Sequence, residues 1–95
     1  PIPGVDYSDC SFDRKSFQKA RLVGARLRDS SFIRADLSGS DLRGCDFRRA
    51  DLRDANFEGS DMRAALLQGA DYDGATCSMR QRQQWEGEVR YPNEE

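Results

Sequence analysis

Residues 35–64 read ADLSGSDLRGCDFRRADLRDANFEGSDMRA, and in this stretch a large apolar residue returns every five positions. The spacing extends over fifteen frames of five, from residue 5 to residue 79, without an insertion. A period of five fits neither the 3.6-residue period of a helix nor the two-residue period of a strand. The central residues of the frames are Tyr7, Phe12, Phe17, Leu22, Leu27, Phe32, Leu37, Leu42, Phe47, Leu52, Phe57, Met62, Leu67, Tyr72 and Cys77.

The first residue of a frame is small (Ala, Ser or Cys) in thirteen of the fifteen frames, with Val5 and Lys15 as the exceptions. One large and one small residue per frame then face inward, and the other three face water. A corner after every frame closes a coil of about twenty residues, and successive coils stack about 4.8 Å apart with paired backbones. Glycines at the frame ends suit such corners, because glycine tolerates unusual backbone angles. We predict a structural core of Leu27, Phe32, Leu37, Leu42, Phe47, Leu52, Phe57 and Met62.

The frames Ala35–Gly39 (ADLSG) and Ala55–Gly59 (ANFEG) resemble those of the pentapeptide-repeat proteins. The resemblance covers residues 5–79, and it implies an all-β fold: a right-handed quadrilateral β-helix, here of about four coils. We therefore expect a leader at residues 1–4, the β-helix at 5–79, and a C-terminal cap with a polar tail at 80–95.

The sequence after the repeat predicts a short helix that covers the last coil. Ser78 and Gln81 fit the S-x-x-Q capping box, helix formers follow, and Gly87 is a stop signal. We expect Trp85 to lie on the open end of the core, although Trp85 and Tyr91 would also suit a partner-binding surface. At the other end, Lys15 in a small-residue position predicts an irregular first coil, and an uncovered end would favour a homodimer.

The composition argues against catalysis. The chain has no histidine, which removes the usual general base and the commonest metal ligand. Cys10, Cys45 and Cys77 are spaced too widely for a disulfide framework or a zinc cluster, and we expect Cys10 and Cys45 to be inward and inert. The stacked carboxylates Asp41 and Asp61 would suit a shared proton or a cation, but Asp is the consensus residue there. We predict no catalytic, cofactor-binding or metal-binding residue, and hence no enzyme and no cofactor.

The net charge is −2, but residues 14–63 hold ten Arg and two Lys against eight acids. Arginines fall in columns on the predicted outer faces, and like charges in a column repel. The candidate partner-binding residues are therefore Arg26, Arg28, Arg34, Arg48, Arg49 and Arg53. The alternative is a solvated surface on which Asp29, Asp41, Asp46 and Asp61 offset the arginines as weak surface pairs.

These features favour a non-enzymatic protein-interaction or scaffolding module. The family resemblance implies an alternative, a DNA-mimicking binder of type II topoisomerases (gyrase) that confers quinolone resistance, although a basic middle argues against it. We do not expect nucleic acid as a partner, because the overall charge is slightly negative. No apolar run is long enough for a membrane span, so we expect no membrane and a cytoplasmic location. The start PIPGVDY, without Met, suggests a trimmed or processed form.

Overall fold

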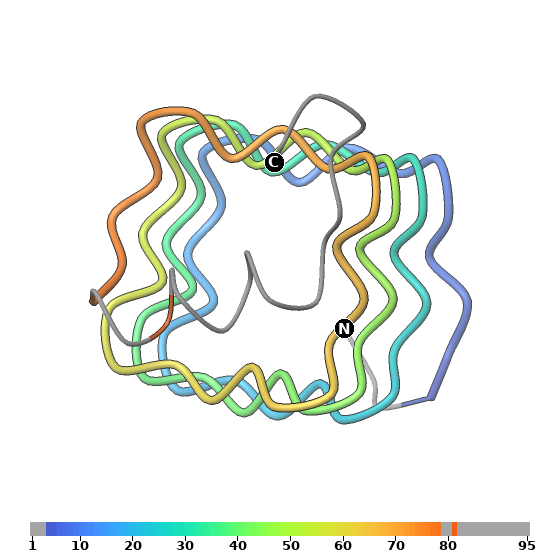
Figure 1. Cartoon of the computed structure of the whole chain (residues 1–95), viewed down its shortest axis with the longest axis horizontal. Coiled ribbons are helices and arrows are strands. Elements are labelled where there is room, and N and C mark those ends of the chain that lie inside the picture. The colour runs from blue at the N-terminus through green and yellow to red at the C-terminus, as the bar shows by residue number, and fades with distance from the viewer. Residues whose placement is uncertain (1–3, 79–80, 82–95) are drawn as a thin grey trace, which may run out of the picture.

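The chain winds into stacked square coils that enclose a narrow core (Figure 1). The computed structural model describes residues 4–78 and residue 81. Within these residues the regular structure consists of single-residue parallel bridges separated by turns. Each bridge joins a residue to the one twenty positions later, from Asp6–Arg26 to Asn56–Thr76. The predicted coil of twenty residues is therefore confirmed over the described part of the chain.

Backbone hydrogen bonds run in both directions between neighbouring coils. The amide of Phe32 donates to the carbonyl of Asp51 at 2.7 Å, and the amide of Asp51 donates to the carbonyl of Ser30 at 2.9 Å. The amide of Arg34 donates to the carbonyl of Arg53 at 3.0 Å. Because these bonds satisfy the polar backbone, the side chains are left to fill the core or to face solvent.

Every corner has the same backbone geometry. In the frame that ends at Arg34, the amide of Ala35 donates to the carbonyl of Phe32 at 3.0 Å, and Arg34 has φ of 59°. Ile33, the second turn residue, does not have a positive φ, and a positive φ at the third residue alone is the mark of a type II turn. Glycines hold this position in seven places, and eight other residues adopt it as well. Those eight are Asp9, Arg14, Lys19, Asp29, Arg34, Arg49, Asp54 and Ala64.

The predicted core residues are all buried, with exposed fractions of 0–2%. The small first residues of the frames pack beside them, and most are buried too: Ala25, Ser30, Ala35, Ser40, Cys45, Ala50, Ala55, Ser60, Ala65, Ala70 and Ala75. One large and one small residue per frame therefore fill the axis, as the pattern predicts.

The first coil differs from the prediction in two ways. Its backbone is regular rather than irregular, since Asp6, Ser11, Ser16 and Arg21 all form bridges to the next coil. Lys15 does not disturb the backbone because its side chain is exposed at the end of the stack. Cys10 is likewise exposed, so the expectation that it points into a closed core is wrong. No described residue covers Cys10 on the side away from the second coil, and its thiol is exposed there.

Ser78 and Gln81 form the predicted capping box. The amide of Ser78 donates to Gln81 Oε1 at 2.7 Å, and the amide of Gln81 donates to Ser78 Oγ at 3.1 Å. The Gln81 side chain is buried and its Nε2 donates to the carbonyls of Phe57 and Ser60, both at 2.8 Å. The rest of the predicted cap, including Trp85 and Tyr91, lies outside the described residues.

Candidate interaction surface

Four Asp-x-Arg units project from the outer faces, each built from the second and fourth residues of a frame. These two positions flank the inward central residue, so their side chains emerge together. In the first unit, Arg43 Nε donates to Asp41 Oδ1 at 2.8 Å and Arg43 Nη2 donates to Asp41 Oδ2 at 2.7 Å. The other units have the same two-bond geometry and are Asp46–Arg48, Asp51–Arg53 and Asp61–Arg63. Bidentate pairs of this kind fix the plane of the guanidinium.

The pairing shifts the ionisation of these groups. The hydrogen bonds from Arg43, Arg53 and Arg63 lower the pKa values of Asp41, Asp51 and Asp61 below the usual value. The same bonds raise the pKa values of the three arginines. All the carboxylates in these three units are therefore ionised at neutral pH, and the units carry no net charge.

The face formed by residues 25–29 and 45–49 holds a denser cluster. Asp46 is 8% exposed and accepts from two arginines, Arg28 at 2.6 Å and Arg48 at 2.8 Å. At the adjoining corner Arg49 pairs with Asp29, one coil earlier, through bonds of 2.9 and 3.0 Å. The hydrogen bond from Arg49 lowers the pKa of Asp29. Two guanidinium groups on one carboxylate leave this face with a local positive charge.

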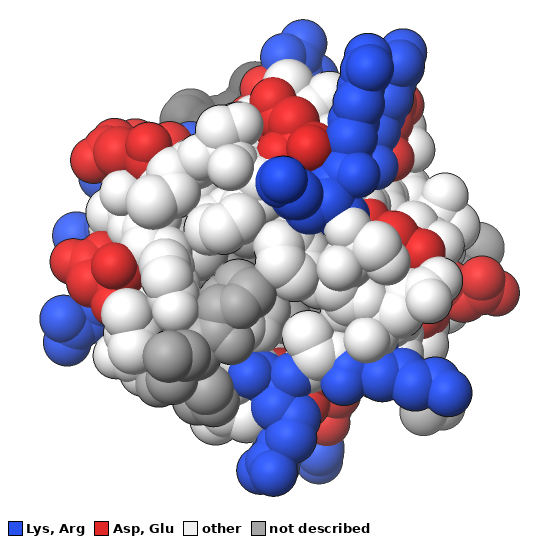
Figure 2. Space-filling view, turned by 180° about the vertical axis from the view of Figure 1, so that it is seen from behind, with Lys and Arg blue, Asp and Glu red and all other residues white. Residues whose placement is uncertain are grey.

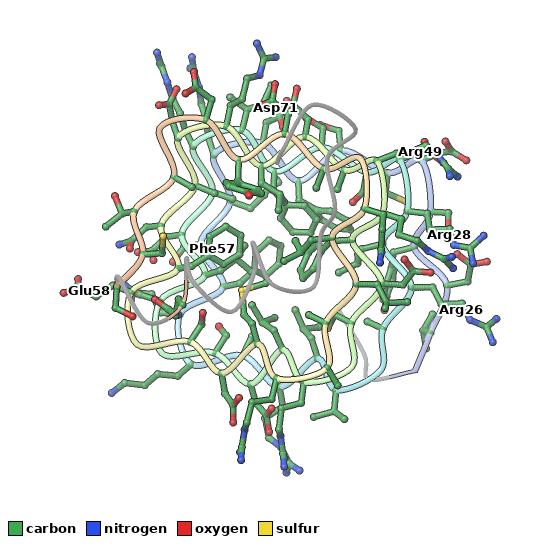
Figure 3. All side chains as sticks on the ribbon, viewed as in Figure 1. Arg26, Arg28, Arg49, Phe57, Glu58 and Asp71 are labelled. Atoms are coloured by element: carbon green, nitrogen blue, oxygen red, sulfur yellow. The ribbon has the colours of Figure 1, made fainter. Side chains whose placement is uncertain are left out.

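The structure places the six predicted binding arginines on two adjoining faces. Figure 3 shows Arg26, Arg28 and Arg49 on one side of the square. Four of the six are ion-paired: Arg28, Arg48, Arg49 and Arg53. Arg26 and Arg34 are exposed and form no ion pair with the described residues. The sequence suggested that four aspartates offset the charge of the arginines, and the structure confirms this, because each of them forms an ion pair with an arginine. The four are Asp29, Asp41, Asp46 and Asp61.

The bases without an ion pair among residues 4–78 and 81 gather near the start of the chain. They are Arg14, Lys15, Lys19, Arg21, Arg26 and Arg34. This division between ion-paired and unpaired bases was not predicted from the sequence. A signal was present, because four of the six paired arginines follow an aspartate by two residues, and the fourth position of a frame is where such pairing occurs.

The stacked aspartates do not form a separate ligand site. Arg43 lies between Asp41 and Asp61, with Nε at 3.9 Å from Asp61 Oδ2. Among residues 4–78 and 81, no three carboxylate or thiol groups converge as a metal site would require. Cys45 is buried, and this burial raises the pKa of its thiol to about 12. No helix in the described residues is long and apolar enough to cross a membrane.

The family profile of pentapeptide repeats matches residues 10–49 and 30–69, which is more than half of the chain. The chain belongs to the pentapeptide-repeat family. A search of curated protein sequences found no match.

Solved structures of the same family have a similar fold. A pentapeptide repeat protein from the thylakoid lumen of Arabidopsis thaliana is 27% identical with a TM-score of 0.61, over 77% of this chain and 58% of that one. Rfr23 from the cyanobacterium Cyanothece 51142 is 18% identical with a TM-score of 0.56, over 78% of this chain and 65% of Rfr23.

Trypsin-treated QnrB1, a plasmid-mediated fluoroquinolone resistance protein, is 28% identical with a TM-score of 0.52, over 77% of this chain and 39% of QnrB1. The chain thus spans less than two thirds of the length of each of the three proteins. Together with the family match, these similarities identify the solenoid as a right-handed quadrilateral β-helix.

Proposed function

We propose that the chain is a non-enzymatic module that binds a protein partner through its outer faces. The observation that carries the proposal is the array of ordered arginines on the faces of residues 25–34 and 45–54. Bidentate bonds hold Arg48, Arg49 and Arg53 in place before any partner arrives. A side chain that is already ordered loses less conformational entropy on binding. Arginine is also enriched in protein interfaces.

The composition supports a binding role rather than an enzymatic one. The sequence has no histidine, and its exposed carboxylates are mainly engaged in ion pairs or hydrogen bonds. A partner with exposed carboxylates would suit the positive face around Arg28 and Arg48, which share Asp46. The free thiols of Cys10, Cys45 and Cys77 suit the reducing cytoplasm, which we propose as the compartment.

The proposal is tested by affinity capture from the source cell, followed by mass spectrometry. The baits are the wild type and Arg48→Gln/Arg53→Gln, which removes one charge from each of the two proposed faces. The matched control is Arg43→Gln/Arg63→Gln, because these arginines form the same Asp-x-Arg units on a different face. We expect a specific protein to be retained by the wild type and the control and lost by the first variant. Identical captures by all three baits would contradict the proposal.

A second candidate is the topoisomerase-binding function that the family resemblance implies. It is favoured by the similarity to QnrB1, a plasmid-mediated fluoroquinolone resistance protein. The ion-paired arginines weigh against it, because they leave the middle of the solenoid without the acidic surface of a DNA mimic. Recovery of DNA supercoiling by quinolone-inhibited gyrase, on addition of this chain, would support this candidate. If quinolones inhibit gyrase equally with and without this chain, the topoisomerase-binding candidate is contradicted and the protein-interaction module is retained.

We further propose that the solenoid has about four coils and ends in a short capping helix. The reciprocal bonds of Ser78 and Gln81 support a helix start at this point. The buried Gln81 side chain supports contact between this segment and the last coil. Deletion of residues 82–95 should lower the melting temperature, and an unchanged melting temperature would contradict the cap.

A further inference from the structure

The face of residues 25–29 and 45–49, which we call the arginine face, has an excess of positive charge. It holds four arginines against two aspartates. The neighbouring stretch of the preceding coil, residues 5–9, holds two aspartates and no base, and residues 65–69 of the following coil hold no charge. Figure 2, in which this side of the square lies at the left edge, shows acidic and basic side chains alternating there. The positive charge is therefore confined to one patch, with acids on one side of it.

Two arginines of this face share one carboxylate. The guanidinium groups of Arg28 and Arg48 donate to the same oxygen, Asp46 Oδ2, at 2.6 and 2.8 Å. Arg28 uses only its Nε for this contact, and its terminal nitrogens form no hydrogen bond with the described residues. Arg26 directly precedes Asp46 in the column of bridges and forms no ion pair with the described residues. The arginine face thus has more N–H donors than its carboxylates occupy.

These donors suit a phosphate monoester better than a carboxylate. A phosphate group on a side chain carries a charge of about −1.5 to −2 at pH 7, which matches the excess of the four arginines over the two aspartates. Its three terminal oxygens can accept from two guanidinium groups at once. Arg28 and Arg48 already lie together on Asp46, so a phosphate would meet a pair of donors that the solenoid has brought side by side.

The acids of the preceding coil restrict what can surround that phosphate. The hydrogen bond from the Ser8 hydroxyl lowers the pKa of Asp6, so this carboxylate is ionised at neutral pH. Asp6 lies one coil before Arg28 and two coils before Arg48, about 5 and 10 Å along the axis. Asp9, in the same frame as Asp6, is exposed. A polyanion would be repelled by these two acids, whereas a segment that combines one phosphate with a basic side chain would complement both signs.

We propose that the arginine face binds a phosphorylated serine, threonine or tyrosine of the protein partner, in an extended segment with a basic residue about three positions away. The phosphate lies on Arg28 and Arg48, and the basic side chain lies on Asp6. The spacing follows from the distance to Asp6, because an extended segment covers about 3.3 Å per residue. This inference rests on the function proposed above and names the chemistry of its partner.

The test is an NMR titration of the isotope-labelled wild type with a synthetic peptide. The peptide has phosphoserine at its centre and, on each side, two glycines followed by an arginine, so that either chain direction is served. We expect shifts of the Nε–Hε signals of Arg28 and Arg48, with unchanged signals for Arg43 and Arg63 on another face. Glutamate in place of phosphoserine should weaken binding at least roughly tenfold. Glutamate in place of both peptide arginines should also weaken it roughly tenfold.

Several results of this titration would overturn the proposal. One is the absence of shifts at the arginine face. Another is equal affinity for the phosphopeptide and its glutamate version. Equal affinity for inorganic phosphate or for a short single-stranded oligonucleotide would overturn it as well, because the flanking basic residue would then contribute nothing.

Variants assign the binding to particular side chains. Arg28→Gln/Arg48→Gln should bind the phosphopeptide at least roughly tenfold more weakly. The matched control is Arg43→Gln/Arg63→Gln, because these arginines hold the same frame position on a face where each pairs with its own aspartate. The control should bind like the wild type, and equal losses in both variants would contradict the assignment. Circular dichroism checks folding, and the signals of the wild type decide the matter if a variant does not fold.

The role of Asp6 is tested by Asp6→Asn, which keeps an oxygen to accept from the amide of Ser8. This variant should show a smaller preference for arginine over glutamate at the ends of the peptide. An unchanged preference would contradict the contact between Asp6 and the basic residue.

A phosphatase treatment separates this inference from the proposed function. In the affinity capture described above, dephosphorylation of the lysate should abolish recovery of the partner. A partner that is still captured after this treatment, and still lost by Arg48→Gln/Arg53→Gln, would support the protein-interaction module and overturn the phosphate inference.

Discussion

The side-chain amide of Gln81 takes the place of a backbone amide at the end of the hydrogen-bond ladder on Ser60. One coil earlier, the carbonyl of Ser40 accepts from the amide of Asp61 at 2.9 Å. The residue twenty positions after Asp61 is Gln81, and its Nε2 donates to the carbonyl of Ser60 at 2.8 Å. The same nitrogen lies 3.0 Å from Ser60 Oγ. A side chain thus satisfies the carbonyl that a further coil would have used.

Gln81→Ala should lower the free energy of unfolding by about 1–3 kcal/mol, because it leaves buried carbonyl groups without this donor. The measurement is urea denaturation followed by circular dichroism. Gln18→Ala is the control, since Gln18 makes one exposed hydrogen bond to Asp36 and its loss should cost less than about 0.5 kcal/mol. Equal stabilities of Gln81→Ala and the wild type would show that this contact does not close the ladder.

Residue 64 offers an unusual case in which glycine should stabilise the protein. Ala64 has φ of 62°, where a Cβ atom is strained, and Gly44 holds the same corner one coil earlier. Ala64→Gly should raise the free energy of unfolding by up to about 1 kcal/mol, after the flexibility of glycine in the unfolded chain is included. Gly44→Ala should lower it by about 1 kcal/mol. A Cβ at residue 44 meets no atom closer than 3.9 Å, so backbone strain alone is tested. A decrease in the free energy of unfolding for Ala64→Gly and an increase for Gly44→Ala would contradict the turn geometry.

Stability should decrease in acid. Hydrogen bonds lower the folded-state pKa values of several aspartates, including Asp41, Asp51 and Asp61. A lowered folded-state pKa adds stability that is present above the unfolded pKa of about 3.9 and is lost as the pH falls through the folded value. The melting temperature should therefore change little between about pH 7 and 5 and fall below about pH 4. Asp51→Asn/Asp61→Asn should show a smaller fall, and an equal fall would contradict the assignment.

The three cysteines should differ in reactivity. Cys45 is 0% exposed and its pKa is raised to about 12, so its nucleophilic thiolate is scarce at pH 8. Cys10 is exposed and should react with iodoacetamide first. Mass spectrometry of the digested protein measures each site, and labelling in denaturant gives the full extent. Modification of native Cys45 as fast as Cys10 would show that the core is more open than the structure indicates.

The five-residue pattern predicted the repeating parts of the molecule well, because one frame reports on its own inward and outward positions. Leu42 and Phe57 are buried for the reason that the pattern gives. The ends were harder to predict, since the burial of Cys10 depends on a neighbouring coil and not on its own frame. The partner of each arginine in an ion pair could not be predicted from the sequence either. Arg48 pairs with Asp46 in its own frame, whereas Arg49 pairs with Asp29 one coil earlier, and the sequence permits both arrangements.

The register of twenty residues per coil determines which residues of neighbouring coils are in contact. It is tested most directly by cross-linking Ser38→Cys with Glu58→Cys, in a chain whose Cys10 and Cys77 are replaced by Ser. The amide of Gly39 donates to the carbonyl of Glu58 at 2.9 Å, so the two sites lie in adjacent coils. At the usual spacing of about 4.8 Å between strands, the two Cα atoms are within disulfide range.

The control pair is Ser38→Cys with Arg63→Cys. Residue 63 is one frame further along the chain than residue 58 and lies on the next face. Mild oxidation and intact mass measurement under non-reducing conditions should show an intramolecular disulfide in the first pair and none in the control. A disulfide in the control pair, with none between residues 38 and 58, would contradict the twenty-residue coil and the surfaces derived from it.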